Sequence, residues 1–159
     1  MPSEAGKKAA PFDSTARGID VGPLAGKVGY ALRRAQLAVF DEIITAFAEV
    51  GLRPAQYAVL VLLDHTPGSK QSDVAGALGI QRANFVALFD SLERRGLARR
   101  CPTPNDRRSY ALYLTEAGQE VLARAARLEA VHEAQLDARL GPGGREQLLR
   151  LLRQVAQRG

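Results

Sequence analysis

The sequence predicts a mainly α-helical protein that carries a small β-wing. Within residues 70–115, a short apolar-periodic segment, a turn centred on Gly79 and a longer amphipathic segment follow one another. Two strand-like runs come next, Leu97–Cys101 and Tyr110–Leu114, and a loop that includes Pro102 joins them. This order is typical of a winged helix-turn-helix, in which a tight glycine turn places the second helix in the major groove of DNA.

The N-terminal part of the chain predicts an arm followed by one long helix. Residues 1–22 have no helical or strand periodicity, so we expect a flexible arm. Apolar residues then recur every three or four positions from Leu24 to Val50, with Pro23 suited to the first turn and Gly51 placed to end the helix. Such a helix is longer than a winged unit needs. We therefore expect its N-terminal half to pack against a second subunit.

The next helix is expected from Pro54 to about His65. Arg53 stands at the cap position, where a side-chain oxygen is normally preferred, and a contact with a phosphate or a ligand is an alternative use for it. Ser69 is predicted to cap the short helix that follows. Gln71 and Ser72 would then lie in its first turn, where amide, hydroxyl and backbone donors can meet a phosphate.

The second helix of the motif has two distinct sides. The residues predicted to be buried are Phe85, Leu88, Phe89 and Leu92. The residues predicted to face outward are Ala83, Asn84, Ala87, Ser91 and Arg94. Small side chains allow close approach to base edges, and Gln81, Arg82 and Asn84 carry groups that can pair with purines. The alternative is an ordinary amphipathic helix with a solvated face.

The charge distribution favours DNA binding. Residues 70–115 hold eight Lys and Arg against four Asp and Glu, whereas residues 1–69 hold seven of each and residues 116–159 hold seven against six. The arginines of this region are Arg82, Arg94, Arg95, Arg99, Arg100, Arg107 and Arg108. Arginines that neutralise phosphates supply a sequence-independent, salt-sensitive part of DNA affinity, and we expect Arg95 and Arg107 to act in this way.

The C-terminal part predicts two further helices. Thr115 can cap a helix from Glu116 to about Leu140, and after residues 141–144 a second helix runs from Arg145 to Gln157. Their apolar stripes have no obvious partner in the winged unit, so we expect a dimer interface formed with the start of the first long helix. Its predicted residues are Leu24, Val28, Leu32, Leu136, Leu140, Leu148, Leu149, Leu152 and Val155. A twofold dimer would set the second helix of each helix-turn-helix, the reading helix, about one DNA turn from its copy. The alternative is a monomer that packs its terminal helices on itself.

Several classes of chemistry have no support in the sequence. No glycine-rich phosphate loop or nucleophile elbow is present, so we do not expect an enzyme. His65 and His132 are far apart and lack metal-ligand spacing, so we expect no metal. Cys101 is the single cysteine; its neighbours Arg99 and Arg100 leave a redox role open. No long apolar run or cleavable leader occurs, and we expect a cytoplasmic protein.

Three stretches give the chain a resemblance to a known family. They are GLRPAQYAVLVLL, QSDVAGALGIQRANFVALFDSLERRGLARR and PNDRRSYALYLTEAG. The chain resembles the MarR (multiple-antibiotic-resistance regulator) family of bacterial winged-helix repressors from roughly Leu24 to the C-terminus. The most specific piece is Asp106 and Arg108 of the wing, ahead of Leu114–Gly118.

The resemblance implies a homodimer, a palindromic operator, and repression relieved by a small ligand or by oxidation. It also implies that Arg108 enters the minor groove while Asp106 holds its guanidinium. A planar fork on a narrow β-tip fits that task and the negative potential of the groove. A solvated ion pair with no role in DNA binding is the alternative.

The resemblance further implies an effector pocket between the first long helix, the next helix and the winged domain. The candidate residues are Tyr30, Arg33, Arg34, Gln56, Tyr57 and His65. Arginine beside an aromatic ring suits an aromatic carboxylate, because it offers a fork for the acid and the ring offers a face. Salt bridges between subunits or plain solvation are the alternatives for Arg33 and Arg34. We expect no cofactor, and an aromatic carboxylate effector of unknown identity.

Together these observations predict a ligand-responsive, dimeric DNA-binding transcriptional regulator, in particular a repressor of a palindromic operator that a small aromatic acid releases. Residues 23–159 would form one domain, with the winged unit at about 53–115 and dimerisation helices at about 23–50 and 116–158. The ligand would favour a dimer whose half-site spacing no longer matches the operator. The alternatives are a non-specific architectural DNA-binding protein and an interaction module that has lost DNA binding.

Overall fold

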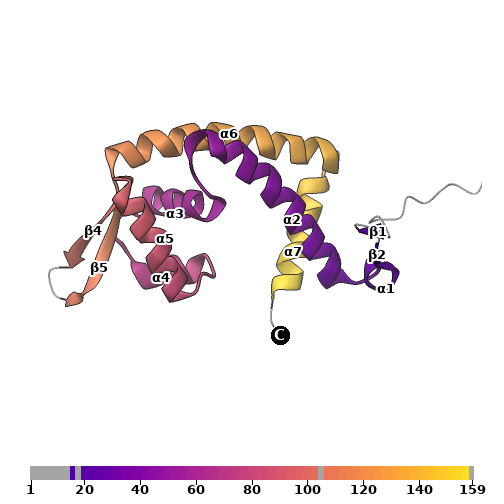
Figure 1. Ribbon diagram of the computed structural model, residues 1–159, viewed down its shortest axis with the longest axis horizontal. Helices are drawn as coiled ribbons and strands as arrows, with labels where there is room; N and C mark the ends of the chain where they lie inside the picture. Colours follow the sequence, from indigo (N-terminus) through magenta and orange to yellow (C-terminus); the bar gives the residue numbers. More distant parts are fainter. Residues whose placement is uncertain (1–14, 17–18, 104–105, 158–159) are drawn as a thin grey trace, which may run out of the picture. The chain divides into compact units, whose positions relative to one another are not determined.

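The fold is mainly helical with a small antiparallel wing, as the sequence predicts (Figure 1). The computed structural model describes residues 15–16, 19–103 and 106–157, and their side chains from 20 to 103 and from 110 to 157. Its contacts divide the chain into two units, residues 1–41 and 42–159, and each unit is described by itself.

The first unit contains a small strand pair and the start of a long helix. β1 (Thr15–Ala16) pairs antiparallel with β2 (Ile19–Asp20), and α1 (Gly22–Ala25) follows. The sequence pattern did not predict the strand pair, because two-residue strands are too short to show a period of two. The rest of the predicted arm, residues 1–14 and 17–18, lies outside the described residues.

The single helix predicted from Leu24 to Val50 is wrong at both ends. A break at Gly26 separates α1 from α2 (Val28–Phe47), and the last residues form a 3-10 turn, η1 (Ala48–Val50). Glycine favours such a break because it loses more conformational entropy than other residues when its backbone is fixed in a helix. Among the described residues no single helix is long and apolar enough to cross a membrane; the bent pair Val28–Val50 and Pro54–His65 passes that test jointly, by length and composition alone.

The helix-turn-helix forms as predicted. Its two helices are α4 (Gln71–Ala77) and α5 (Arg82–Arg94), and α3 (Pro54–His65) precedes them. Gly79 in the turn before α5 has φ +63°, a conformation that residues with a side chain rarely adopt. At the start of α3 the backbone N–H of Arg53 donates to Gln56 Oε1 (2.8 Å), which partly replaces the cap that an arginine cannot supply.

The wing has three strands rather than two. Its strands are β3 (Ser69–Lys70), β4 (Ala98–Thr103) and β5 (Asp106–Leu114), in the order β3-β5-β4. Ser69 is therefore not the cap of α4: it pairs with Leu112 in the sheet, and its hydroxyl donates to the Thr66 carbonyl. Pro102 lies in β4 rather than in the loop and pairs with Tyr110. An edge strand tolerates proline because its outer N–H groups need no partner in the sheet.

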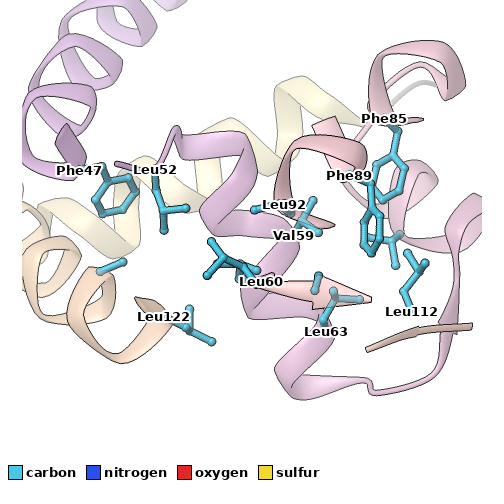
Figure 2. Packing of buried hydrophobic residues seen from close by; sticks show 14 of the residues in the cluster. Phe47, Leu52, Val59, Leu60, Leu63, Phe85, Phe89, Leu92, Leu112 and Leu122 are labelled. Atoms are coloured by element: carbon cyan, nitrogen blue, oxygen red, sulfur yellow. The ribbon is translucent and has the colours of Figure 1, made fainter. Parts of the chain in front are cut away.

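The hydrophobic core joins α2, α3, α5, the wing and α6 (Glu116–Leu140). Phe85, Phe89 and Leu92 of α5 are fully buried, as predicted, and Leu88 is half-buried. Figure 2 shows the rings of Phe85 and Phe89 close together on α5, with ring centroids 6.0 Å apart. This packing fixes which side of α5 faces away from the protein.

α6 begins against the base of the wing. Thr115 caps it as predicted: its hydroxyl accepts from the Gly118 N–H (3.0 Å) and donates to the Gly96 carbonyl (2.6 Å). A Cβ built on Gly118 would lie 2.0 Å from the Leu97 carbonyl oxygen, so only glycine fits there. At the other end of α6, Arg145 at the start of α7 (Gly144–Ala156) pairs with Glu133 and Asp137.

Candidate nucleic-acid interface and effector groove

The first turn of α5 presents the predicted reading residues to solvent. Gln81, Arg82, Ala83 and Asn84 are all exposed, and Ala87 continues this surface one turn further along. The buried rings of Phe85 and Phe89 hold the helix from behind. The geometry therefore suits an exposed helix start that can approach base edges.

Ser91 does not belong to that surface. It is half-buried: its hydroxyl accepts from Gln56 Nε2 of α3 (2.9 Å) and donates to the Leu88 carbonyl (2.5 Å). Its hydrogen-bonding groups are thus engaged inside the protein. Ser91 is therefore less exposed than predicted, and its contact with DNA stays a prediction.

Arg95, predicted to contact a phosphate, is also engaged. It lies one residue beyond α5, and its guanidinium donates to the carbonyls of Gly51 (2.7 Å) and Val50 (3.3 Å). These carbonyls lie in the turn between η1 and α3. Arg95 therefore fastens the end of the reading helix to that turn, although its side chain is exposed like that of Arg94 beside it.

Not every arginine of residues 70–115 presents its charge to solvent. Arg100 is 17% exposed and pairs with Asp90 (2.7 Å) and Glu93 (2.5 Å) of α5. Gln71, a predicted phosphate contact, is half-buried and accepts from Arg100 Nε (3.4 Å). Ser72 is exposed, with its hydroxyl 3.1 Å from the carboxylate of its neighbour Asp73. Ser72 thus stays a candidate phosphate contact, whereas the side chains of Arg100 and Gln71 bind each other.

The tip of the wing carries the remaining DNA predictions. Asp106, Arg107 and Arg108 lie in β5, but their side chains lie outside the described residues, so their roles stay predictions. On β4, the guanidinium of Arg99 lies over the ring of Tyr113, 5.1 Å from its centroid. Its Nη1 is 2.8 Å from the sulfur of Cys101.

A groove of about 730 Å³ opens beside the reading helix. Its lining residues are Ile44, Ala48, Gly51, Leu52, Arg53, Ala55, Gln56, Asn84, Ala87, Leu88 and Ser91. Most of these are apolar or small. Arg53 is exposed, and the described part of the chain offers its guanidinium no ion-pair partner. Asn84 and Ala87 belong both to this groove and to the predicted reading surface.

Two of the predicted effector residues on α3 do not line this groove, although Gln56 does. Tyr57 packs on the Phe47 ring (centroids 4.9 Å apart), and burial raises its pKa, with the carboxylate of Glu129 adding to the effect. His65 is exposed at the far end of α3, about 13 Å from Gln56 by the helical rise. Of the three α3 residues, this groove thus takes only Gln56, and a role of Tyr57 and His65 toward an effector stays a prediction.

The predicted effector residues on the first long helix belong to the first unit. Tyr30 is half-buried there, and Arg33 and Arg34 are exposed. Arg33 Nη1 lies 3.4 Å from Gln36 Oε1, one turn along the same helix. Their role toward an effector stays a prediction.

The predicted dimer residues form exposed apolar surface in both units. Leu24 and Val28 in the first unit are 48% and 63% exposed, and Leu32 is half-buried. In the second unit the exposed residues are Leu140, Leu148, Leu149, Leu152 and Val155, at 37–57%, while Leu136 is half-buried. Contiguous apolar surface on terminal helices is typical of an interface between protein chains.

No group of three or more potential metal ligands occurs in the described part of the chain. His132 is buried, and its Nε2 lies 3.3 Å from Glu42 Oε2 without hydrogen-bond geometry. Arg139 grips the Glu42 carboxylate with two hydrogen bonds (2.8 and 2.5 Å), which lower the pKa of Glu42. These three side chains join α2 to α6.

Most of the groove, and the contacts that Arg95 and Arg100 make within the protein, were not predicted from the sequence. A signal for the groove was present, because small residues recur at Ala48, Ala55 and Ala87. A signal for Arg100 was also present, because Asp90 and Glu93 stand three residues apart on the reading helix.

Comparisons with known proteins agree with this geometry. A model described as "MarR family" matches residues 50–109. The solved structure of a transcriptional repressor, CouR, bound to a 23-mer DNA duplex is 48% identical, with a TM-score of 0.83 over 87% of this chain and 99% of that chain. CouR bound to p-coumaroyl-CoA is 44% identical, with a TM-score of 0.82 over 89% of this chain and 99% of that chain.

A curated relative extends the likeness. The putative transcriptional regulatory protein for the hcr operon of Thauera aromatica is 34% identical over 84% of this chain and 81% of its own length. These comparisons agree with the resemblance noted in the sequence. They confirm the prediction of a transcriptional regulator rather than an enzyme. The chain belongs to the MarR family of winged helix-turn-helix transcriptional regulators.

Proposed function

We propose that the protein is a dimeric repressor of a palindromic operator and that an aromatic acyl compound releases it from DNA. The proposal rests on one observation: α5 belongs both to the predicted DNA-reading surface and to the wall of the groove. Its first turn is exposed for reading bases, and Asn84 and Ala87 on the same helix line the groove. A ligand in the groove therefore contacts the reading helix itself.

Each subunit inserts the start of α5 into a major groove and its wing into the adjacent minor groove. Arg82 and Asn84 read purine edges, while Ser72, Arg94 and Arg107 contact phosphates. The exposed leucines of α6 and α7 join two subunits, so that the two reading helices match the two halves of a palindrome. The structure of CouR bound to a 23-mer DNA duplex, at 48% identity, supports duplex DNA as the partner.

The groove suits an amphipathic anion. Its volume of about 730 Å³ lies in the range of small-molecule sites, and its wall is largely apolar. Arg53 is exposed and has no ion-pair partner among the described residues, so its guanidinium can pair with a carboxylate or a phosphate. The structure of CouR with p-coumaroyl-CoA supports an aromatic acyl group as the shared chemistry, presented either as the free acid or as its CoA thioester.

Release requires the effector to bind the DNA-competent and DNA-incompetent states unequally. The Gln56–Ser91 hydrogen bond closes one wall of the groove and holds α5 against α3. An aromatic ring inserted there separates the two helices, which moves the reading helix. In a dimer that movement changes the distance between the two half-site contacts.

The test begins with selection of bound genomic fragments by the purified protein, followed by footprinting. A discrete palindromic footprint supports the proposal, and protection without a discrete site supports the architectural alternative. The operator complex is then titrated with p-coumarate, p-coumaroyl-CoA, acetyl-CoA and free CoA. Release by the acid identifies a free carboxylate effector, and release by the aromatic thioester alone identifies the CoA form. Equal effects of all four compounds, or none, contradict the aromatic acyl effector.

A further inference from the structure

Among the described side chains of the wing, Arg100 on β4 makes several polar contacts with the helix-turn-helix. Its backbone N–H and its Nη1 both donate to the Glu93 carboxylate, at 2.9 and 2.5 Å. Its Nη2 lies 2.7 Å from Asp90 Oδ1, and its Nε donates to Gln71 Oε1 at 3.4 Å. The guanidinium carbon also lies 4.6 Å from the centroid of the Phe89 ring.

The side chain of Arg100 reaches two elements, and its backbone pairs with a third. Asp90, Glu93 and Phe89 belong to the reading helix α5, and Gln71 opens α4. Arg100 itself pairs with Leu112 of β5, the strand that continues to the tip of the wing. A planar guanidinium with five donors can satisfy several partners at fixed angles, which a lysine ammonium cannot do.

The two carboxylates also change what the positive charge of Arg100 can do. Asp90 and Glu93 are 41% and 38% exposed, while Arg100 is only 17% exposed. Its charge is therefore compensated within the protein and turned away from solvent. A phosphate contact would require exchange of these partners, so the contribution of Arg100 to DNA binding lies in geometry rather than in charge.

We infer that Arg100 is a positioning residue that fixes the wing relative to the reading helix, so that both engage DNA in one step. The inference rests on the proposed function for the DNA contacts of α5 and the wing. A wing that is already oriented loses less conformational freedom on binding, which raises affinity without adding a contact.

The test uses the full-length protein and the operator found by fragment selection. Arg100→Lys keeps the charge but loses the fork and the ring contact, and Arg99→Lys on the same strand is the matched control. We expect Arg100→Lys to bind the operator about tenfold more weakly with an unchanged salt dependence, because the number of neutralised phosphates stays the same. Arg99→Lys is expected to stay within about twofold of the wild type.

A double-mutant cycle distinguishes positioning from general destabilisation. Arg108→Ala removes the predicted minor-groove contact, and we expect it to cost about tenfold in affinity in the wild-type background but at most about threefold beside Arg100→Lys. A residue that only stabilises the fold would leave the cost of Arg108→Ala the same in both backgrounds. Glu93→Gln, which removes a negative charge from α5, provides a second background. It should also reduce the cost of Arg108→Ala.

Wild-type affinity in Arg100→Lys, or full additivity in both backgrounds, overturns the inference while the proposed function stands. Arg100→Gln, which removes the charge, should also leave the salt dependence unchanged; a flatter salt dependence in that variant overturns the inference, because Arg100 would then be a phosphate contact. Failure of the wild type to bind any discrete operator overturns the proposed function and, with it, the inference.

Discussion

The side-chain amide of Gln56 donates to the hydroxyl of Ser91 at 2.9 Å and so joins the start of α3 to the reading helix α5. Both residues line the groove. The same amide accepts from the Arg53 N–H through its oxygen, so Gln56 holds the first turn of α3 and the middle of α5 together. Any occupant of the groove acts on this connection.

Gln56→Leu is expected to bind the operator more weakly and to lose its response to the effector, because the hydrogen bond that holds α5 against α3 is already absent. The fold should lose about 1 kcal/mol of stability, because a partly buried hydrogen bond is removed. Fluorescence anisotropy with labelled operator, with and without p-coumaroyl-CoA, measures the response. Gln119→Leu on the exposed side of α6 is the control and should respond like the wild type. A Gln56→Leu protein that the effector still releases would contradict this role.

Arg82→Ala and Arg95→Ala are expected to act in different ways. Arg82 is exposed at the start of α5, so its loss should relax base preference by about 1–3 kcal/mol. Arg95 is bonded to the carbonyls of Gly51 and Val50, so its loss should lower the free energy of unfolding by about 1 kcal/mol and leave the salt dependence of binding unchanged. Binding to a panel of operator variants, together with urea denaturation, separates the two effects.

Gly118→Ala is expected to destabilise the protein strongly. The added Cβ would lie 2.0 Å from the Leu97 carbonyl oxygen and 2.9 Å from Leu114 Cδ1, so α6 must move away from the wing. We expect a loss of at least about 3 kcal/mol in urea denaturation. Gly76→Ala in α4 is the matched control. Its Cβ would meet nothing within 4 Å, and it should gain about 0.5–1 kcal/mol from helix propensity.

The Glu42–Arg139 pair should make stability depend on pH. Its hydrogen bonds hold the pKa of Glu42 below the ordinary value of 4.5. The pair therefore stabilises the folded state above pH 4.5, and this contribution is lost as the pH falls through the lowered pKa. Glu42→Gln should be less stable than the wild type near neutral pH, and the difference should shrink at pH about 3. A difference that stays constant over this range would contradict the argument.

Leu152→Asp is expected to separate the proposed dimer. Leu152 is 37% exposed on α7, and a carboxylate buried in an apolar interface carries a large desolvation cost. Light scattering should show a monomer, and the variant should no longer protect the whole palindrome. Gln154→Asp, on the exposed surface of the same helix, should remain dimeric. An unchanged dimer in Leu152→Asp would place the interface elsewhere.

Helical periodicity predicted the elements that hold the reading helix in place. Phe85, Phe89 and Leu92 recur at helical spacing and are all buried, and the range Pro54–His65 was predicted correctly. Periodicity identifies the buried side of a helix but not the neighbour beside its edge. For that reason Ser91 was assigned to solvent, although it faces Gln56.

Charge counting gave the location of the basic region but not the use of each arginine. Arg95 and Arg100 add to the total, yet one is bonded to backbone carbonyls and the other to two carboxylates. These partners are brought near only by folding. The two-residue strand β3 and the contact at Gly118 were likewise outside prediction, because each depends on segments distant in the sequence.

The close contact between Gly118 and Leu97 also fixes the start of α6 against the wing. From Gly118, α6 continues as one helix to Leu140, about 33 Å away by the helical rise. If α6 rotates by about five degrees about Gly118, its end at Leu140 moves by about 3 Å. In the proposed dimer, a small rotation of the winged unit would therefore become a larger displacement where α6 meets the partner subunit.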